Sequence, residues 1–476
     1  MRTLFLLLAA ALLLLPAPTL ASSPAQEPPD GPVYIVQQGD SLWDIAARFR
    51  VSMADLQAAN GISNPSQLSA GARLVIPGLS GVKGVLTTRP IQIGENLRSL
   101  SRHFQVPEDI LIRLNHITSP AELYAGSTLV LPLTETSAPA TKRSLVTPGQ
   151  TLLELAVVQQ SNPWTYMEAN QLPSSWSALP GDVLHLPIEQ SEAGAEIQSS
   201  ALPEAISNIT LGPGRMEQGN VSVIQIEGAP GIQLGGALLD RQLHFFPQGE
   251  GLYISMQGIH VMTDAGLYSM VISGTLPLEA PYFGAAFALA QPVLVYSGNY
   301  PFDPVLSVSP ETIDPTVTQP EDAEWSALAA TATPEKLWNG QFTSPVAPPF
   351  DDCWPSLFGN RRSYNGSEYK YFHSGLDFCG GVGIEIIAPA AGRVVFAGPL
   401  TVRGNATMID HGWGIYSAYL HQSEILVKPG DLVAQGQVIG KIGGTGRVTG
   451  PHLHWEIWAG GVQVDPLQWL EETFPN

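Results

Sequence analysis

The feature of this sequence that most limits its fold is an internal repeat with a period of 55 residues. Three glycines mark the start of each copy, at Gly39, Gly94 and Gly149. Further positions recur with the same offset: Asn60, Asn115 and Asn170; Gly71, Gly126 and Gly181; Pro77, Pro132 and Pro187. Because the three copies align without an insertion, we expect three small structural units in series.

Each copy predicts a strand, two helices and a second strand. In the first copy a β-type run covers residues 33–36, and Asp40 or Ser41 can cap a helix whose apolar positions recur with helical spacing. A second helix is expected over residues 53–59, and residues 73–76 form the closing strand. A βααβ unit of about 45 residues must bury both helices on one two-stranded sheet, since it has little other apolar surface to cover.

The repeats resemble the LysM domain, a carbohydrate-binding module of cell-wall proteins. The first copy carries the resemblance most closely, in VYIVQQGDSLWDIAARFRVSMADLQAANGI and LSAGARLVIP. The second copy lacks the Gly-Asp-Ser-Leu start, and the third is the most degenerate. We assign LysM 1 to residues 32–78, LysM 2 to residues 88–133 and LysM 3 to residues 144–188.

The LysM resemblance implies binding of glycan that contains N-acetylglucosamine, in a groove formed by two loops of the module. In the first copy these loops hold Gly39, Asp40, Ser41, Asn60, Gly61 and Ile62. The alternative is that these residues serve only as turn and capping residues. Copies two and three can likewise be spacers that have lost glycan binding.

The N-terminus has the pattern of a secretory signal. Arg2 supplies a positive start, the run from Leu4 to Leu15 is apolar, and Ala21 ends a small-residue cleavage site. We expect a signal peptide over residues 1–21 and a secreted or extracytoplasmic protein associated with cell wall or periplasm; an uncleaved anchor is the alternative. The run is shorter than the about 20 residues of a spanning helix, so no stable membrane insertion is expected after cleavage.

Charge and length narrow the choice of partners and folds. The formal net charge of −20 excludes nucleic acid as a partner, because phosphate binding requires clustered Lys and Arg. It is compatible with a neutral glycan, and its simplest effect is solubility. At 476 residues the chain is too long for a single core.

The middle of the chain changes pattern. Residues 205–300 contain short β-type runs separated by Gly and Pro turns, which predict an all-β sandwich. The pattern loosely resembles an immunoglobulin-like domain. Residues 301–340 hold several prolines and one helical stretch, from Glu321 to Ala330, and we expect them to be a linker.

The sequence contains two cysteines, Cys353 and Cys379, both near the C-terminus. Outside the cytoplasm, two nearby thiols most often form one disulfide, which is our expectation. Two buried free thiols, or a metal contact by Cys379, are the alternatives.

The candidate chemistry lies after residue 370. His373 and Asp377 form an HxxxD motif, His452 and His454 form an HxH motif, and His421 lies between them in a glycine-rich frame. If the HxH segment is a strand, its two histidines point to the same face. Two imidazoles and one carboxylate make a three-ligand zinc set with an open fourth position.

Residues 341–476 resemble the lysostaphin-like, or LytM-type, zinc metallopeptidases. The motifs that carry the resemblance occur in order: HSGLDF, APAAGRVVFAG, IDHGWGIYSAYLHQ and GGTGRVTGPHLHWEI. The resemblance implies a mainly antiparallel β domain with zinc in an open groove. The fold class expected for the whole chain is therefore multidomain: three small α+β LysM modules, an all-β immunoglobulin-like sandwich and a mainly antiparallel-β zinc peptidase domain.

The same resemblance assigns roles to five residues. It implies that His373, Asp377 and His454 are the zinc ligands. It implies that His421 and His452 are unliganded active-site histidines, one the general base and the other a partner of the oxyanion or the leaving amine. Which histidine has which role stays open.

The sequence thus predicts a zinc endopeptidase that hydrolyses peptide crosslinks or stem peptides of bacterial peptidoglycan. The stem peptide would bind at the peptidase domain and the glycan at the LysM modules. The alternative is a non-enzymatic peptidoglycan-binding regulator or activator of other cell-wall hydrolases; the presence of all five site positions favours the enzyme. Glu456, two residues after His454, is expected to orient a ligand, and His411 to be structural.

Overall fold

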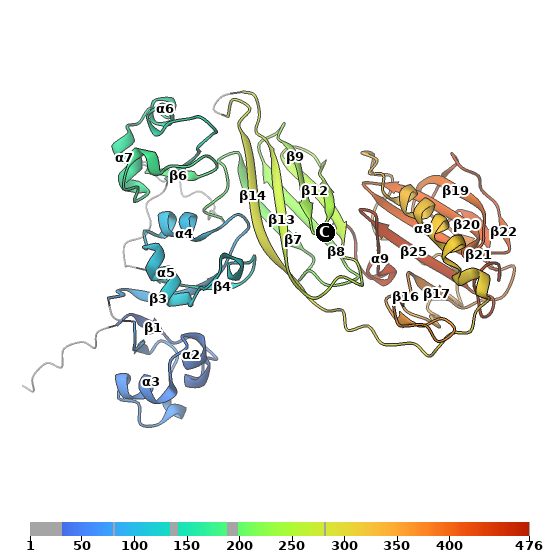
Figure 1. Cartoon of the computed structure of the whole chain (residues 1–476), viewed down its shortest axis with the longest axis horizontal. Helices are drawn as coiled ribbons and strands as arrows, with labels where there is room; N and C mark the ends of the chain where they lie inside the picture. Colours follow the sequence, from blue (N-terminus) through green and yellow to red (C-terminus); the bar gives the residue numbers. More distant parts are fainter. Residues whose placement is uncertain (1–30, 80, 134–140, 188–198, 280–281, 476) are drawn as a thin grey trace, which may run out of the picture. The chain divides into compact units, whose positions relative to one another are not determined.

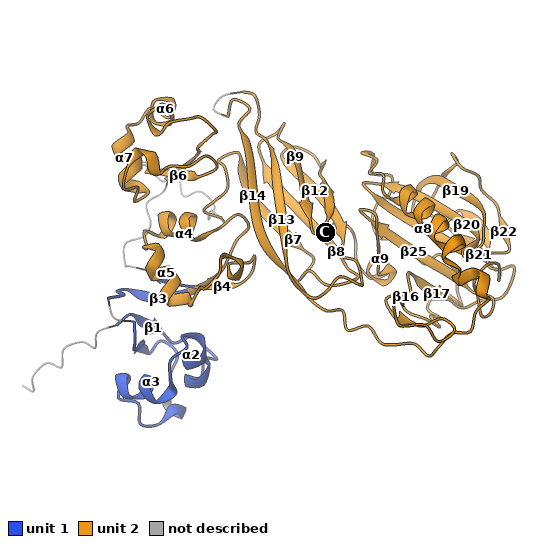
Figure 2. Ribbon diagram, in the orientation of Figure 1, with its two compact units in different colours: residues 1–87, 130–137 blue, residues 88–129, 138–476 orange. Residues whose placement is uncertain are grey.

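The structure is a computed structural model that describes residues 31–79, 81–133, 141–187, 199–279 and 282–475. The predicted signal at residues 1–21 lies outside these ranges. The chain divides into two compact units, residues 1–87 with 130–137 and residues 88–129 with 138–476 (Figure 2). Among the described residues, we find no helix with both the length and the apolar character required to span a bilayer.

The first unit contains the first repeat. Its elements are β1 (Val33–Ile35), α2 (Leu42–Arg48), α3 (Met53–Asn60), the 3₁₀ turn η2 (Pro65–Gln67) and β2 (Arg73–Val75). β1 pairs antiparallel with β2, so that Tyr34 lies opposite Leu74. Both helices bury apolar side chains, among them Ile45 and Leu56, which are fully shielded from solvent. This is the βααβ unit that the sequence predicts.

Asn60, the last residue of α3, joins that helix to the closing strand. Its side-chain Nδ2 donates to the carbonyls of Leu56 and Val75, both at 2.8 Å, and its Oδ1 accepts from the Val75 N–H at 2.7 Å. Asn170 makes the same pair of contacts with the main chain of His185 in the third repeat. In these two copies the recurring asparagine is therefore a structural bridge between helix and strand.

The second unit begins with the remaining repeat elements. They are α4 (Leu97–Phe104), α5 (Glu108–Asn115), η3 (Pro120–Glu122), β5 (Thr141–Leu145), α6 (Leu152–Val158), α7 (Pro163–Ala169), η4 (Ser175–Ser177) and β6 (Val183–Pro187); β3 (Val85–Pro90) and β4 (Thr128–Leu133) cross the boundary between units. In the third repeat, β5 and β6 pair antiparallel under α6 and α7, and Leu155 and Tyr166 are buried in its core. All three copies thus share the order strand, helix, helix, strand.

Two four-stranded antiparallel sheets follow and share one core. Their strands are β7 (Ile206–Gly212), β8 (Val221–Gly228), β9 (Gln233–Leu238), β10 (Arg241–His244), β11 (Phe246–Pro247), β12 (Leu252–Gly258), β13 (Gly266–Thr275) and β14 (Ala286–Val295). The orders are β10-β9-β13-β14 and β11-β12-β8-β7. Ile224 and Ile226 from one sheet and Ile272 from the other lie in the same apolar cluster. Residues 205–300 are therefore built as a β sandwich.

The last part of the chain is built on a seven-stranded sheet. Its strands are β17 (Leu376–Phe378), β19 (Gly392–Leu400), β20 (Gly404–Gly412), β21 (Ile415–Gln422), β23 (Leu432–Val433), β25 (Leu453–Ala459) and β26 (Val462–Val464). The order is β17-β25-β21-β20-β19-β23, all antiparallel, with β26 beside β25. Smaller sheets join β15 (Arg361–Arg362) to β16 (Tyr371–Phe372), and β18 (Glu385–Ile387) to β24 (Val438–Lys441) and β22 (Glu424–Ile425). The helix α9 (Pro466–Glu471) follows.

Residues 301–340, expected to be a linker, pack on this sheet. They contain α8 (Pro315–Ala329), which lies across the large sheet in Figure 1. Trp325 and Ala329 of α8 are buried in one cluster with Met408 of β20 and Tyr416 of β21. The sandwich also contacts the sheet, since the Phe246 ring stacks on Trp413 at 5.3 Å.

We predict that Asn60→Ala destabilises the first repeat. The change leaves the Val75 N–H and carbonyl without their side-chain partner, which costs about 1–3 kcal/mol for buried polar groups. Hydrogen exchange in the full chain should show faster exchange of the Val75 amide. Asn64→Ala is the control, because the exposed Asn64 side chain caps only η2, at Ser66; equal loss of protection at Val75 in both variants would contradict the prediction.

Candidate active site

Strand pairing brings Asp377 and His454 together. β17 and β25 are antiparallel neighbours, and in their register Asp377 lies directly opposite His454. The flanking residues Leu376 and Phe378 point the other way, into the core. Alternation along a strand explains this, because successive side chains point to opposite faces. The third residue, His373, lies three residues before the start of β17.

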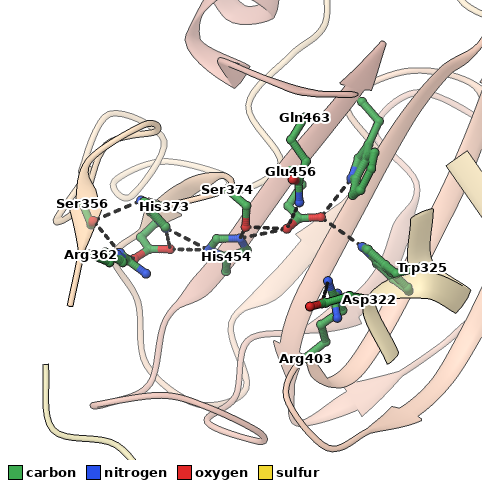
Figure 3. A network of polar contacts seen from close by, with 12 residues as sticks. Asp322, Trp325, Ser356, Arg362, His373, Ser374, Arg403, His454, Glu456 and Gln463 are labelled. Carbon is green, nitrogen blue, oxygen red and sulfur yellow. Dashed lines mark hydrogen bonds and ion pairs between the residues drawn. The ribbon is translucent and has the colours of Figure 1, made fainter. Parts of the chain in front are cut away.

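Three donor atoms of these residues converge. His373 Nε2 lies 2.9 Å from Asp377 Oδ1 and 2.9 Å from His454 Nδ1, and His454 Nδ1 lies 2.8 Å from Asp377 Oδ1. All three side chains are buried. Figure 3 shows His373 and His454 directed toward each other. The structure therefore brings together the three residues that the sequence predicts as metal ligands.

The hydrogen bonds behind these atoms decide which nitrogens carry protons. His373 Nδ1 lies 2.7 Å from the Leu357 carbonyl, an acceptor, so Nδ1 donates and Nε2 keeps its lone pair. His454 lies between two carboxylates, with Nδ1 2.8 Å from Asp377 Oδ1 and Nε2 3.4 Å from Glu456 Oε1. Burial alone would lower the pKa of this imidazole, but its hydrogen bonds to Asp377 and Glu456 raise it. Burial also lowers the pKa of His373 to about 4, which keeps this imidazole neutral.

Asp377 is an anion in this setting. Burial alone would raise the pKa of its carboxyl, but the adjacent His373 and His454 hold that pKa well below its usual value. Two imidazole nitrogens and one carboxylate oxygen thus lie within 2.9 Å of one another. A divalent cation among the three atoms would take the place of any proton shared between them. Nitrogen and oxygen donors with one open position fit a catalytic zinc ion, so the residues present fit the predicted cofactor.

His421 reaches the site through a β-bulge. The pairing of β20 with β21 shifts register between Asn405 and Thr407, where β21 carries one extra residue. His421 lies in this bulge with φ of 65°, a left-handed conformation that few residues other than glycine adopt. Its Nδ1 lies 2.8 Å from the Thr445 carbonyl, so Nδ1 donates and Nε2 is the basic nitrogen. The bulge re-aims this side chain at the cost of regular pairing.

His452 lies beside His421, with the two ring centroids 5.0 Å apart. Its Nδ1 donates to the Gly450 carbonyl at 2.8 Å, and its Nε2 lies 3.6 Å from Asp377 Oδ1. Burial, with His454 and His452 nearby, lowers the pKa of His421 well below its usual value. In both imidazoles Nδ1 is bonded to a main-chain carbonyl, which leaves Nε2 as the ring nitrogen available to the site.

A cavity of about 550 Å³ opens onto this cluster, within the range of ligand sites. His421, His452 and His454 line it together with Asp377. Its walls come from four segments: residues 303–322, 355–374, 402–403 and 447–451. The site is therefore open to a ligand and is bordered by the segment that leads into α8.

Several predicted residues lie elsewhere or carry other contacts. Cys353 and Cys379 are joined by a disulfide in the described structure, with 5.4 Å between their Cα atoms. Cys379 therefore has no free thiolate for a metal. His411 is buried away from the cluster, where its ring contacts the Ala391 carbonyl and the Ser417 hydroxyl.

The predicted glycan loops of the first repeat are shaped by turn and cap contacts. Gly39 and Gly61 have left-handed backbone conformations, Gly61 at the end of α3. Ser41 caps α2, and the Asp40 carboxylate accepts from the Tyr34 hydroxyl at 2.6 Å. Glycan contact by these loops stays a prediction.

Sequence reasoning missed three groups around the cluster. The Leu357 carbonyl and the Ser356 hydroxyl contact His373 Nδ1, at 2.7 and 3.1 Å. Trp325 of α8 donates from its indole nitrogen to Glu456 at 3.0 Å. A carbonyl has no sequence signature, and Trp325 lies in a segment without a motif.

Comparison with known proteins agrees with this geometry. The profile of peptidase family M23 matches residues 371–466, and the LysM domain profile matches residues 34–77 and 91–132. Residues 371–466 form a peptidase family M23 domain. The matched residues include the four histidines and the one aspartate of the cluster, His373, Asp377, His421, His452 and His454.

Two curated relatives share the M23 domain. Peptidoglycan DD-endopeptidase ShyA of Vibrio cholerae is 39% identical over 122 residues, which are 25% of this chain and 28% of that protein. DD-carboxypeptidase/endopeptidase Mpg of Neisseria meningitidis is 41% identical over 95 residues, 20% of this chain and 22% of that protein. The matched stretches span about a quarter of the length of these relatives. Among solved structures, the catalytic domain of lysostaphin from Staphylococcus simulans is 26% identical, with a TM-score of 0.21, and covers 32% of this chain and 98% of its own.

Zinc should stabilise the M23 domain after metal has been removed with a chelator. A ligand that binds only the folded state adds about 4 kcal/mol at 1,000 times its Kd, so the midpoint of thermal unfolding should rise when zinc is restored. His454→Ala should abolish this rise, because it deletes one of the three donors. Differential scanning calorimetry measures both.

The matched control is His411→Ala, which also deletes a buried, hydrogen-bonded imidazole. It should lower the unfolding midpoint and keep the response to zinc. A zinc response in His454→Ala, or its loss in His411→Ala, would count against the assigned metal position.

Proposed function

We propose that this protein is a zinc-dependent endopeptidase that hydrolyses peptide crosslinks or stem peptides of bacterial peptidoglycan. In this proposal His373, Asp377 and His454 are the zinc ligands, and His421 and His452 are the catalytic histidines. The LysM modules hold the enzyme on the glycan strands of the same polymer.

One observation carries the proposal. Three candidate metal-binding atoms lie within 2.9 Å of one another, beside an open cavity and two more imidazoles whose Nδ1 atoms are bonded to main-chain carbonyls. A structural histidine needs only one acceptor and one donor, as His411 finds in the Ala391 carbonyl and the Ser417 hydroxyl. Convergence of metal donors with free bases is the arrangement that metal-assisted hydrolysis requires.

The chain's own residues can divide the chemistry. Zinc, when bound, supplies Lewis acidity that favours attack by water on a peptide carbonyl. His421 and His452 each have Nδ1–H fixed by a main-chain carbonyl, so each can use Nε2 toward substrate. One accepts the proton of the attacking water, and the other, once protonated, donates to the oxyanion or to the leaving amine.

The substrate class rests on the relatives and on the LysM profile. Relatives named as peptidoglycan DD-endopeptidases share the M23 domain, and LysM modules accompany it in this chain. Modules that bind the glycan raise the effective concentration of stem peptides near the site. We include the third repeat as a LysM-like unit because it keeps the strand, helix, helix, strand order. The proposal places the protein outside the cytoplasm, in contact with the cell wall.

Glycan binding is proposed for the first repeat at the loops that hold Gly39, Asp40, Ser41, Gly61 and Ile62. Asn60 would support the second of these loops by fixing the end of α3, since its amide is occupied by main-chain partners. The immunoglobulin-like character of the sandwich remains a prediction.

The proposal predicts that His421→Ala and His452→Ala each lower kcat on purified peptidoglycan by about 10²- to 10⁴-fold, the usual contribution of a general acid or base. Both variants should keep the zinc-dependent rise in unfolding midpoint, because neither removes a ligand. Mass spectrometry of released fragments gives the rate and identifies the bond. His244→Ala, an exposed histidine of the sandwich, should leave the rate unchanged.

The same measurements distinguish an endopeptidase from a non-enzymatic regulator of other cell-wall hydrolases. If the wild-type protein binds zinc, releases no fragment, and stimulates a second hydrolase on the same peptidoglycan, it is a regulator and the endopeptidase proposal is wrong. Release of fragments that persists in His454→Ala with chelator present would likewise exclude a zinc mechanism.

A further inference from the structure

Glu456 is a buried carboxylate whose two oxygens are fully engaged. Oε1 accepts from the Ser374 hydroxyl at 2.7 Å and from Gln463 Nε2 at 3.1 Å, and it faces His454 Nε2 at 3.4 Å. Oε2 accepts from the indole N–H groups of Trp458 and Trp325, at 2.9 and 3.0 Å (Figure 3). A carboxylate only 1% exposed is tolerated because every lone pair is directed at a donor.

One of these donors comes from outside the M23 domain. Ser374, Trp458 and Gln463 lie within residues 371–466, whereas Trp325 belongs to α8. α8 thus supplies a hydrogen bond to a group that the domain carries next to His454. Among the described residues, α8 both reaches this carboxylate with Trp325 and lines the cavity with Thr318 and Asp322.

The Trp325 indole is held rigidly. It is fully buried, packs edge-on against the Phe396 ring at 5.4 Å, and has the Arg403 guanidinium over its face at 5.2 Å. About one helical turn before Trp325, Glu321 accepts from the backbone N–H groups of residues 401–403, at 2.8 to 3.0 Å. The direction of the Trp325 N–H is therefore fixed by packing and by this clamp together.

Glu456 in turn lies behind His454. Its Oε1 and the Ser374 hydroxyl that it holds face Nε2 of His454, at 3.4 and 3.3 Å. When Nδ1 of His454 binds a cation, Nε2 carries the ring proton, and these two groups are the acceptors placed to receive it. Partners of this kind behind a ligating imidazole typically change metal affinity or activity by about 10- to 100-fold.

We propose that Trp325 is a positioning residue for the metal centre, which acts on His454 through Glu456, so that α8 is part of the catalytic unit. This inference rests on the proposed zinc site. A purely structural Trp325 would support the core of the sheet, and its loss would lower stability without a specific effect on metal binding.

The test deletes the indole N–H and keeps an aromatic ring at residue 325. In Trp325→Phe the zinc Kd, measured by competition with a chromophoric chelator, should rise about 10-fold, and kcat/KM at saturating zinc should fall with it. The matched control is Trp338→Phe, which also removes a buried indole N–H, donated there to the Phe474 carbonyl at 3.0 Å. That variant should lose stability and keep the wild-type zinc Kd. Equal zinc Kd values in the two variants would overturn the proposal.

A double-mutant cycle tests the route. If Trp325 acts through Glu456, the zinc Kd of the double variant Trp325→Phe with Glu456→Gln should equal that of Glu456→Gln alone. Multiplication of the two separate effects would show that Trp325 acts independently of Glu456. If Phe at this position prevents folding, β-(3-benzothienyl)alanine at residue 325 keeps the bicyclic shape and lacks the N–H, and the same Kd comparison applies.

The wild-type measurement separates this inference from the proposed function. A wild-type chain that binds zinc tightly and does not cleave peptidoglycan removes the endopeptidase proposal, while the zinc Kd values still decide the role of Trp325. A wild-type chain that binds no zinc removes both.

Discussion

The pairing of β17 with β25 places Asp377 opposite His454, and the other groups of the site are arranged around this pair. Once the two side chains are opposed, one turn of chain before β17 suffices to bring His373 beside them. The far nitrogens of both imidazoles then face acceptors, the Leu357 carbonyl behind His373 and the Glu456 carboxylate behind His454. The near nitrogens and the Asp377 carboxylate are thereby left grouped as candidate ligands of one cation.

The sequence predicted this cluster because strand alternation and motif spacing are local properties. Strand alternation in HxH places His452 and His454 on one face, and the resemblance to zinc metallopeptidases adds His373 and Asp377 to the set. The meeting of Asp377 with His454 itself depends on the pairing of β17 with β25. The contribution of Trp325 could not be predicted in that way. It lies 131 residues before Glu456, and its proline-containing segment is typical of a spacer. Only the three-dimensional packing of α8 on the sheet shows which side of this helix is functional.

The features of the fold that depend on local sequence were also predictable, and those that depend on a distant partner were not. The 55-residue period predicted the repeat units, since each unit buries its own helices on its own strands. The period did not reveal why Asn60 recurs. A loop residue that binds glycan and a residue that links a helix to a strand would both be seen only as a recurring asparagine. The bulge at His421 was also beyond prediction, since an extra residue is defined only against the partner strand β20. Apolar residues of β8 were assigned to the sandwich, yet Val221 and Val223 pack with the M23 domain.

The disulfide encloses two of the proposed zinc ligands in one covalent ring of chain. Cys353 and Cys379, separated by 26 residues, close a ring of chain that includes Ser356, His373 and Asp377. Two of the three proposed donors, with a polar group that orients one of them, are therefore confined within one covalent loop before any ion arrives. Closing such a loop restricts the open conformations that would otherwise have to be lost on binding. The ring thus behaves as a macrocyclic chelator, to which β25 adds the remaining imidazole.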